Sequence, residues 1–338
     1  MRNITIISDV WTTTNVSGVV TWLLNTKRGL EERGFMVTLI HPGQFNNFPL
    51  PTYPEIKISM PTRKKMENMI RSDNPDYICI ATEGPLGLIA RSACLKNEWK
   101  FTTFYHTRLP EYLYVRFKTF KNVTYQYMRW FHNASACTMV TTRSLMRELE
   151  QKEFEHLALI PLGVDIELFR KNPHAKIPTE FHKPVFVYMG RIAPEKNIEA
   201  FLECNLPGSK LIIGDGPSKS ALEEKYENRA IFVGYKKGQE LIDLLSVSDV
   251  FVFPSKTDTF GLTIIEALAC GLPVAAYDVQ GPNDIITSGE EGFLGSDLEG
   301  NAKKCLEIDS AKCIKKAQEY TWDNSVKIFA ENLVPMGS

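Results

Sequence analysis

The sequence predicts an α/β protein built from two Rossmann-like, doubly wound parallel-sheet domains. With 338 residues, the chain is about twice as long as an ordinary domain. Short β-branched runs alternate with helical patterns, as in parallel sheets covered by helices. Residues 170–184 carry Pro173, Pro178 and Pro184 without hydrophobic periodicity, and they separate two such series. We therefore expect domains at residues 1–172 and 173–319, followed by a terminal segment, 320–338.

The candidate strands are runs of β-branched and aromatic residues bounded by turn signals. In the first series they lie at residues 3–8, 36–41, 77–81, 100–105, 137–141 and 157–161. In the second they lie at 185–189, 210–213, 230–233, 250–254 and 274–277, with helical patterns at 198–204, 218–226, 238–247 and 262–269. Doubly wound folds bind ligands at the carboxyl ends of their strands, so we look for the chemistry in the loops that follow strands.

Composition excludes several classes of protein. Hydrophobic residues make up 43% of the chain and charged residues 23%, which is unlike a fibrous or disordered protein. The net charge of -1 gives no general attraction to nucleic acid. The seven cysteines are scattered without a C-x-x-C pair, as expected for reduced thiols in the cytoplasm rather than a zinc site. No apolar run is long enough for a signal peptide or a membrane span, so we expect a cytoplasmic protein.

The strongest motif follows the predicted strand 250–254. Phe260-Gly261-Leu262-Thr263 opens a helix, and the free backbone N–H groups at a helix start form a natural phosphate site. Glycine at 261 allows close approach of a ligand. Glu266, about one turn further on, can accept hydrogen bonds from a pair of ribose or sugar hydroxyls. Taken singly, Gly261 is more often a turn glycine and Glu266 more often a solvated helix residue. The combination of the two is much less common.

Two further glycine loops follow strands in the second series. Gly190-Arg191 and Lys196 come directly after strand 185–189, and an arginine and a lysine so placed can clamp a diphosphate. The alternative is a solvated loop. Residues 214–217 begin like a dinucleotide motif, but position 219 is lysine, so the full G-x-G-x-x-G is absent. We interpret them as a strand-to-helix turn in which Gly216 can approach a phosphate.

These motifs resemble the retaining glycosyltransferases of family 4, which have the GT-B fold of two Rossmann-like domains facing across a cleft. The family pattern has a loop with glycine, arginine and lysine, then a carboxylate, seven residues and a glutamate, with Phe-Gly between. One departure is that Asp258 stands where the family usually has glutamate. The resemblance also includes residues 17–19, 104–110 and 162–165, and a terminal helix, 320–329, that crosses back to the first domain.

The resemblance implies a set of site residues. It places catalytic roles on His106, Arg191, Lys196, Asp258 and Glu266, and donor binding on Gly18, Gly190, Gly216, Phe260, Gly261, Leu262 and Thr263. A lone histidine is structural more often than catalytic, but the position of His106 directly after the predicted strand 100–105, together with the resemblance, favours the active-site role. We interpret the other histidines as structural: His41, His132, His156, His174 and His182.

The predicted function is metal-independent transfer of a hexose, with retention, from GDP-mannose or a UDP-hexose to a lipid or glycan acceptor. No Asp-x-Asp pair is present to hold a metal-bridged diphosphate, so Arg191, Lys196 and the helix start at 261–263 must meet its charge. We expect no cofactor. The sequence of the second-domain motifs most resembles that of bacterial mannosyl-, glucosyl- and sulfoquinovosyl-type lipid transferases. A sugar-nucleotide epimerase of the same fold and a non-catalytic two-lobed sugar-binding protein are the alternatives.

A basic, aromatic stretch lies in the first, acceptor-side domain. Residues 101–132 contain eleven aromatic residues together with Arg108, Arg116, Lys118, Lys121 and Arg129. Such a stretch suits contact with anionic lipid or an acceptor groove, although many of its aromatic residues could be core. We therefore expect peripheral contact with the inner face of the membrane through residues 108–131, and no nucleic-acid partner.

Overall fold

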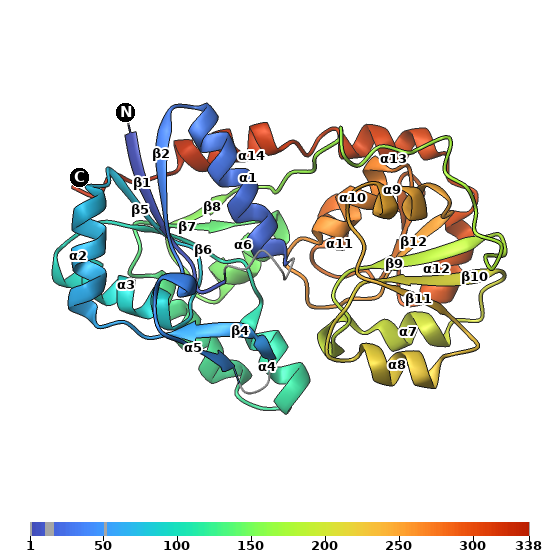
Figure 1. The fold of residues 1–338 in the computed structure, drawn as a ribbon, viewed down its shortest axis with the longest axis horizontal. Coiled ribbons are helices and arrows are strands. Elements are labelled where there is room, and N and C mark those ends of the chain that lie inside the picture. Colours follow the sequence, from blue (N-terminus) through green and yellow to red (C-terminus); the bar gives the residue numbers. More distant parts are fainter. Residues whose placement is uncertain (1, 11–16, 51–52, 338) are drawn as a thin grey trace. The chain divides into compact units, whose positions relative to one another are not determined.

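The computed structural model describes residues 2–10, 17–50 and 53–337, except for the side chains of residues 50, 53–57, 116 and 117. Its contacts divide the chain into two compact units. Unit 1 comprises Met1–Pro110, Thr119–Pro161 and Trp322–Ser338, and unit 2 comprises Glu111–Lys118 and Leu162–Thr321. The chain therefore passes into the second unit earlier than the expected boundary at 172. Each unit contains one parallel sheet with helices, which confirms the predicted α/β class (Figure 1).

Unit 1 is built on a six-stranded parallel sheet in the order β2-β1-β5-β6-β7-β8. Its register is regular at the centre, where Ile4 pairs with Val37 on one side and with Tyr77 on the other. The strands are β1 (Arg2–Ile7), β2 (Phe35–Ile40), β5 (Tyr77–Ile80), β6 (Thr102–Phe104), β7 (Cys137–Val140) and β8 (Leu157–Leu159). An antiparallel pair, β3 (Asn47–Leu50) and β4 (Tyr53–Ser59), lies outside this sheet and was not predicted.

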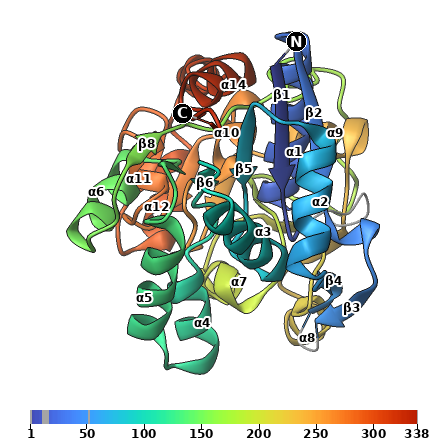
Figure 2. The ribbon, with the colours of Figure 1, turned by 90° about the vertical axis from the view of Figure 1, so that its left-hand side faces the viewer.

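The helices of unit 1 bury apolar side chains against the sheet and against one another. Met66 of α2, Leu86 of α3 and Phe131 of α5 share one core with the central strands, and α2 and α3 lie side by side (Figure 2). Trp22 of α1 contacts Phe329 of α14, with ring centroids 5.5 Å apart. The helices are α1 (Gly18–Glu32), η1 (Pro42–Gln44), α2 (Arg63–Asp73), α3 (Pro85–Lys96), α5 (Lys121–His132), α6 (Arg143–Gln151) and α14 (Trp322–Glu331). Helix α4 (Leu109–Phe117) begins in unit 1, but most of it lies in Glu111–Lys118, which is grouped with unit 2.

The C-terminal helix belongs to unit 1, although it follows the whole of unit 2 in the sequence. Gly29 of α1 allows the close packing, because a Cβ atom there would lie 2.9 Å from Cγ2 of Val326. Arg33 donates to Asp323 at 2.5 Å, which joins the same two helices. The tail beyond α14 also joins unit 1, since the N–H of Lys100 donates to the carbonyl of Met336. The predicted return of the terminal helix to the first domain is confirmed.

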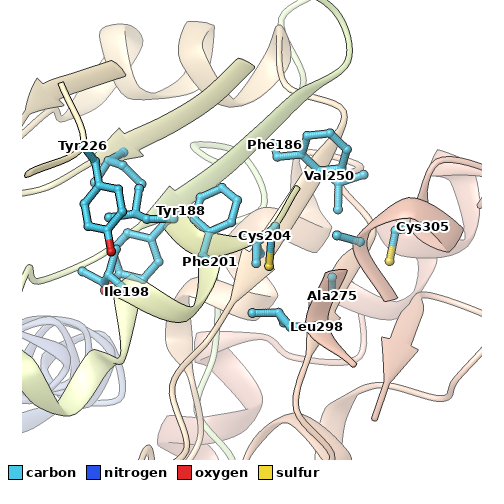
Figure 3. Close-up of a cluster of buried hydrophobic side chains, with 14 of the residues drawn as sticks. Phe186, Tyr188, Ile198, Phe201, Cys204, Tyr226, Val250, Ala275, Leu298 and Cys305 are labelled. Atoms are coloured by element: carbon cyan, nitrogen blue, oxygen red, sulfur yellow. The ribbon is translucent and has the colours of Figure 1, made fainter. Parts of the chain in front are cut away.

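Unit 2 has a second six-stranded parallel sheet, in the order β11-β10-β9-β12-β13-β14. Its strands are β9 (Val185–Met189), β10 (Ser209–Ile213), β11 (Ile231–Gly234), β12 (Val250–Phe253), β13 (Val274–Ala276) and β14 (Gly292–Leu294). Its helices are η2 (Pro194–Lys196), α7 (Ile198–Glu203), α8 (Lys219–Lys225), α9 (Gly238–Ser246), α10 (Leu262–Ala269), α11 (Pro282–Ile285), α12 (Leu298–Cys305) and α13 (Ser310–Ala317). Phe186, Phe201 and Val250 are fully buried between the sheet and its helices (Figure 3).

Two sequence-level expectations about thiols and membranes can be set against the structure. All seven cysteines are free and buried. Among the described residues, no helix is both long enough and apolar enough to cross a bilayer.

Candidate functional site

The strand order of unit 2 marks where a ligand is expected. From β9 the chain turns to β10 on one side, whereas β12 lies on the other side of β9. Adjacent parallel strands whose connections diverge in this way open a crevice at their carboxyl ends, and such crevices bind ligands. The loops at this point are residues 190–197 after β9 and 254–261 after β12. They contain half of the twelve site residues that the sequence predicts.

The first loop is fixed by its backbone. Gly190 has a φ of +151°, and its N–H donates to the carbonyl of Ile213 at 3.0 Å. The phenol of Tyr188, at the end of β9, donates to the carbonyl of Arg191 at 2.8 Å. The main chain that carries Arg191 is therefore held from two sides.

The turn after β10 supports this loop from the neighbouring strand. The N–H of Ile192 donates to the carbonyl of Asp215 at 2.8 Å. Gly216 has a φ of +154°, and a Cβ atom there would lie 2.3 Å from the carbonyl oxygen of Ile192. A Cβ at Gly214 would lie 1.9 Å from the carbonyl oxygen of Gly190. Both glycines are required because the two backbones approach so closely.

Lys196 joins the two loops. It forms an ion pair with Asp258, and both side chains are largely buried, with 19% and 14% of their surface exposed. The hydroxyl of Thr257 donates to the carbonyl of Glu195 at 3.2 Å, and the amide of Asn197 donates to the carbonyl of Pro254 at 3.0 Å. Three side-chain contacts thus hold the loops after β9 and β12 against each other.

The ion pair keeps Lys196 charged in spite of its burial. Burial alone would lower the pKa of Lys196, but the Asp258 carboxylate, aided by nearby phenols, raises the pKa above its ordinary value. The second carboxylate oxygen of Asp258, Oδ2, is buried without a hydrogen-bond partner among the described residues. Unit 2 therefore presents a permanent cation and a carboxylate oxygen with spare capacity to accept a hydrogen bond.

The structure adds Tyr112, which the sequence motifs did not single out. Tyr112 lies in Glu111–Lys118, the short segment whose contacts group it with unit 2. Its phenol interacts electrostatically with Lys196, and burial raises the pKa of Tyr112 to about 12. The signal that could have found it is its place just after the His106 motif, two residues beyond Pro110.

The start of α10 has the geometry that the sequence predicts for a phosphate site. Gly261 precedes the helix with a φ of +92° and has no side chain that could cap it. Leu262 and Thr263 are the first two helical residues, so their N–H groups have no acceptor within the helix. The ring of Phe260 is buried, 5.7 Å from that of Tyr320. Phe260 therefore anchors the backbone that leads into Gly261.

Glu266 lies further along α10. Burial raises the pKa of Glu266 to about 7, well above the ordinary value of a glutamate. This carboxyl group therefore changes its charge near neutral pH.

The remaining predicted residues, Gly18 and His106, belong to unit 1. Gly18 is the first residue of α1, and the side chain of Ser17 caps that helix by accepting from the N–H of Val20. His106 follows β6, and its ring stacks on that of Phe104, with centroids 4.0 Å apart. Burial, with a smaller effect of His132, lowers the pKa of His106 to about 3, so its imidazole is neutral at physiological pH.

The basic, aromatic stretch contains three groups of residues: arginines in ion pairs, core residues, and exposed apolar residues. Arg108 pairs with Glu148 at 2.8 Å, and Arg129 pairs with Glu153, so both help to hold the fold. Met128 and Phe131 are core, whereas a second group of large apolar side chains is exposed: Tyr114, Phe120, Val123 and Trp130. The side chain of Arg116 lies outside the described residues.

Comparison with known families decides the assignment. The description "Glycosyltransferase Family 4" matches residues 16–168, and "Glycosyl transferases group 1" matches residues 169–303. The chain belongs to glycosyltransferase family 4. Membership of family 4 confirms the resemblance, the GT-B fold and the transferase class that the sequence predicted.

Several family 4 relatives are named enzymes. The chain is 29% identical to sulfoquinovosyl transferase SQD2 of Arabidopsis thaliana, over 81% of this chain and 56% of that protein. It is 26% identical to a GDP-mannose-dependent alpha-mannosyltransferase of Mycobacterium tuberculosis (strain CDC 1551 / Oshkosh), over 75% of this chain and 70% of the relative. It is 27% identical to alpha-monoglucosyldiacylglycerol synthase of Acholeplasma laidlawii, over 87% of this chain and 85% of that protein. The match thus spans little more than half of the Arabidopsis protein.

Solved structures agree on the fold of this family 4 member. Sucrose-phosphate synthase from Thermosynechococcus elongatus superposes with a TM-score of 0.78 at 19% identity, covering 98% of each chain. Anabaena Alr3699/HepE in complex with UDP superposes with a TM-score of 0.71 at 16% identity, covering 98% of this chain and 99% of that one.

Proposed function

We propose that this family 4 glycosyltransferase moves a hexose from a nucleotide sugar, GDP-mannose or a UDP-hexose, to a lipid or glycan acceptor, with retention of configuration and without a metal ion. The observation that carries the proposal is the position of Lys196. It is a buried, permanently charged side chain between the loops that follow β9 and β12, where a doubly wound sheet binds its ligand.

The donor's diphosphate is assigned to Arg191, Lys196 and the start of α10. An ammonium group has three N–H donors, so Lys196 can keep Asp258 and still donate to a phosphate oxygen. The guanidinium of Arg191 can bind two phosphate oxygens side by side. The N–H groups of Leu262 and Thr263, with the positive end of the helix dipole, add to the stabilisation of the leaving diphosphate.

The other assignments follow from charge and hydrogen-bonding capacity. Glu266 accepts hydrogen bonds from the ribose hydroxyls, which an ionised carboxylate does with both oxygens. His106, as a neutral imidazole, contacts the transferred sugar. Gly18, Gly190 and Gly216 allow the donor to approach the backbone. Asp258 positions Lys196, and its second oxygen is left for a sugar hydroxyl; aspartate is one methylene shorter than the glutamate usual in the family.

Metal independence rests on the way in which charge is supplied. The sequence has no Asp-x-Asp pair to bridge a divalent cation to the diphosphate. Two cationic side chains and a helix start can neutralise the same charge in a buried site, where each interaction is stronger than in water. Retention requires that the acceptor attack the face that the nucleotide leaves, through an oxocarbenium-like transition state.

A glycolipid acceptor is favoured by the relatives and by α5. Two of the relatives are named sulfoquinovosyl transferase and alpha-monoglucosyldiacylglycerol synthase, and the second name is that of a glycolipid synthase. On α5, Val123 and Trp130 are exposed and lie seven residues apart, so they share one face of the helix, and Phe120 is exposed just before it. An apolar stripe of this kind suits peripheral contact with the inner face of a membrane.

The first test is a thermal-shift panel of GDP-mannose, UDP-glucose, UDP-galactose, UDP-N-acetylglucosamine, GDP and UDP with EDTA present. A ligand that binds the folded state raises the melting temperature by mass action. We expect one sugar nucleotide and its nucleoside diphosphate to stabilise the chain. The product's anomeric configuration is then read by NMR with dioleoylglycerol in phosphatidylglycerol vesicles as acceptor. No response to any nucleotide would overturn the proposal. Epimerisation of the donor sugar in the absence of an acceptor would overturn it as well.

The site assignments are tested by substitution. Lys196→Ala and Glu266→Ala should each lower turnover by about a hundredfold or more, as loss of a group that stabilises the transition state does. Lys225→Ala is the matched control, because Lys225 also pairs with a carboxylate of unit 2, that of Glu199, but is mostly exposed. Near-normal turnover in both site variants, with melting temperatures equal to that of the control, would refute the assignment.

A further inference from the structure

Unit 1 has its own point where strand connections diverge. From β1 the chain goes through α1 to β2, whereas β5 lies on the opposite side of β1 and leads through α3 to β6. The crevice rule therefore applies at the carboxyl ends of β1 and β5 as well. Two carboxylates lie in the loops there: Asp9, after β1, and Glu83, after β5.

Asp9 is fully occupied by the fold. Its carboxylate accepts from the N–H of Leu86 at 2.7 Å and from the hydroxyl of Thr82 at 2.8 Å. Asp9 therefore caps α3 from the loop that follows β1. The packing is so close that a Cβ atom at Gly84 would lie 2.5 Å from the carboxylate carbon. Asp9 shapes the loop and has little capacity left for a ligand.

Glu83 is held differently, and by one oxygen. Its Oε1 accepts from Nε2 of His132 at 3.1 Å, and its side chain is 9% exposed. Its carbonyl accepts from the phenol of Tyr127. Among the described residues, Oε2 has neither a hydrogen bond nor an ion pair. Glu83 is thus a carboxylate nine-tenths buried, with one oxygen left over at a predicted ligand-binding edge.

His132 is itself locked in place. Its Nδ1 lies 2.9 Å from the hydroxyl of Thr103, which in turn is bonded to the hydroxyls of Ser135 and Thr138. All of these side chains are buried. Because an ionised carboxylate only accepts, Nε2 must carry the hydrogen that is shared with Glu83. The network therefore fixes the direction of Glu83 without using its second oxygen.

We propose that Glu83 is the residue by which unit 1 binds a neutral hydroxyl group of the acceptor, and that His132 is the positioning residue that holds it. The proposal rests on the proposed transfer function and names the acceptor chemistry. A carboxylate with no cation paired to its second oxygen, and with Asp9 close by, repels phosphate and attracts hydroxyl donors. The acceptor hydroxyl donates to Oε2, and no covalent bond is made or broken at Glu83.

The test measures steady-state transfer to dioleoylglycerol in phosphatidylglycerol vesicles by the full chain. In Glu83→Gln, the amide oxygen can keep its bond to His132 while the NH2 group replaces Oε2. Loss of one charge-assisted hydrogen bond should raise the acceptor KM about tenfold to a hundredfold. The donor KM and UDP or GDP binding should stay within twofold, because the groups assigned to the diphosphate and the ribose lie in unit 2. His132→Asn should show the same split between the two KM values.

Glu67→Gln is the matched control. Glu67 is also a mostly buried carboxylate of unit 1, at 12% exposure, but it pairs with Arg63 and Lys96. If Glu83→Gln unfolds, Glu83→Asp keeps the charge, shortens its reach and must still raise the acceptor KM. Acceptor kinetics of Glu83→Gln equal to those of Glu67→Gln would overturn the inference alone. Absence of transfer by the unsubstituted chain would instead overturn the proposed function.

Discussion

At the scale of single residues, Glu266 links the site to pH. Its pKa of about 7 means that the folded chain holds a proton that the unfolded chain, with an ordinary value of 4.5, releases. Stability from this group therefore falls as pH rises from about 4.5 to about 7. Nucleotide binding should move in the opposite direction, since ribose hydroxyls donate best to the ionised carboxylate.

We accordingly expect GDP-mannose or a UDP-hexose, whose diphosphate diester does not titrate in this range, to bind roughly tenfold more weakly at pH 6 than at pH 8, because a carboxyl group with a pKa of about 7 is about tenfold less ionised at pH 6. Isothermal titration in two buffers of different ionisation enthalpy should also detect proton release on binding. Glu266→Gln does not titrate, so its affinity should be lower but independent of pH in this range. An unsubstituted chain whose affinity is equally flat would show that Glu266 does not contact the ligand.

At the scale of elements, the loops after β9 and β10 pack directly against each other, and glycines make this close packing possible. Gly216→Ala should place a Cβ against the carbonyl of Ile192 and force the Arg191 loop to move. A strained residue of this kind costs about 1–3 kcal/mol, and we expect weaker nucleotide binding as well as a lower melting temperature. Gly238→Ala is the control, because a Cβ there meets nothing within 4 Å. Equal effects of the two substitutions on nucleotide affinity would contradict the expectation.

The elements also show how far sequence reasoning reaches. The helix 262–269 was predicted with its observed bounds, because Gly261 and Gly271 bracket it. The pair β3 and β4 was not predicted, because prolines at 49, 51 and 54 interrupt the alternation that identifies strands. β14 was not predicted because its sequence, Gly-Phe-Leu, contains no β-branched residue.

The site residues, too, include some that local sequence motifs predict and some contacts that they do not predict. Loops that follow strands could be located because their motifs are local in sequence. The contact of Lys196 with Asp258 spans 62 positions, and that of His132 with Glu83 spans 49, so both depend on the order of strands in the sheet. His132 was interpreted as structural, and only its partner gives it a role. The catalytic and donor-binding roles of the twelve residues stay predictions.

At the scale of the whole molecule, unit 1 depends on the end of the chain. Trp322, Val326 and Phe329 of α14 are buried. Loss of one buried aromatic side chain costs about 3–5 kcal/mol, and a domain is stable by only about 5–15 kcal/mol. Deletion of residues 322–338 should therefore unfold unit 1 while unit 2 still binds UDP or GDP. Limited proteolysis with nucleotide titration checks this; a protease-resistant unit 1 would contradict it.

The position of α14 also has a consequence for synthesis on the ribosome. Domains generally form in the order in which they emerge, the N-terminal one first. Here the helix that packs on α1 is made after unit 2, because Val326 can reach Gly29 only once all of unit 2 has been translated. The nascent chain must therefore carry an incomplete first domain, with the Trp22 face of α1 uncovered, through the whole translation of the second. The second unit can therefore complete its fold before the first.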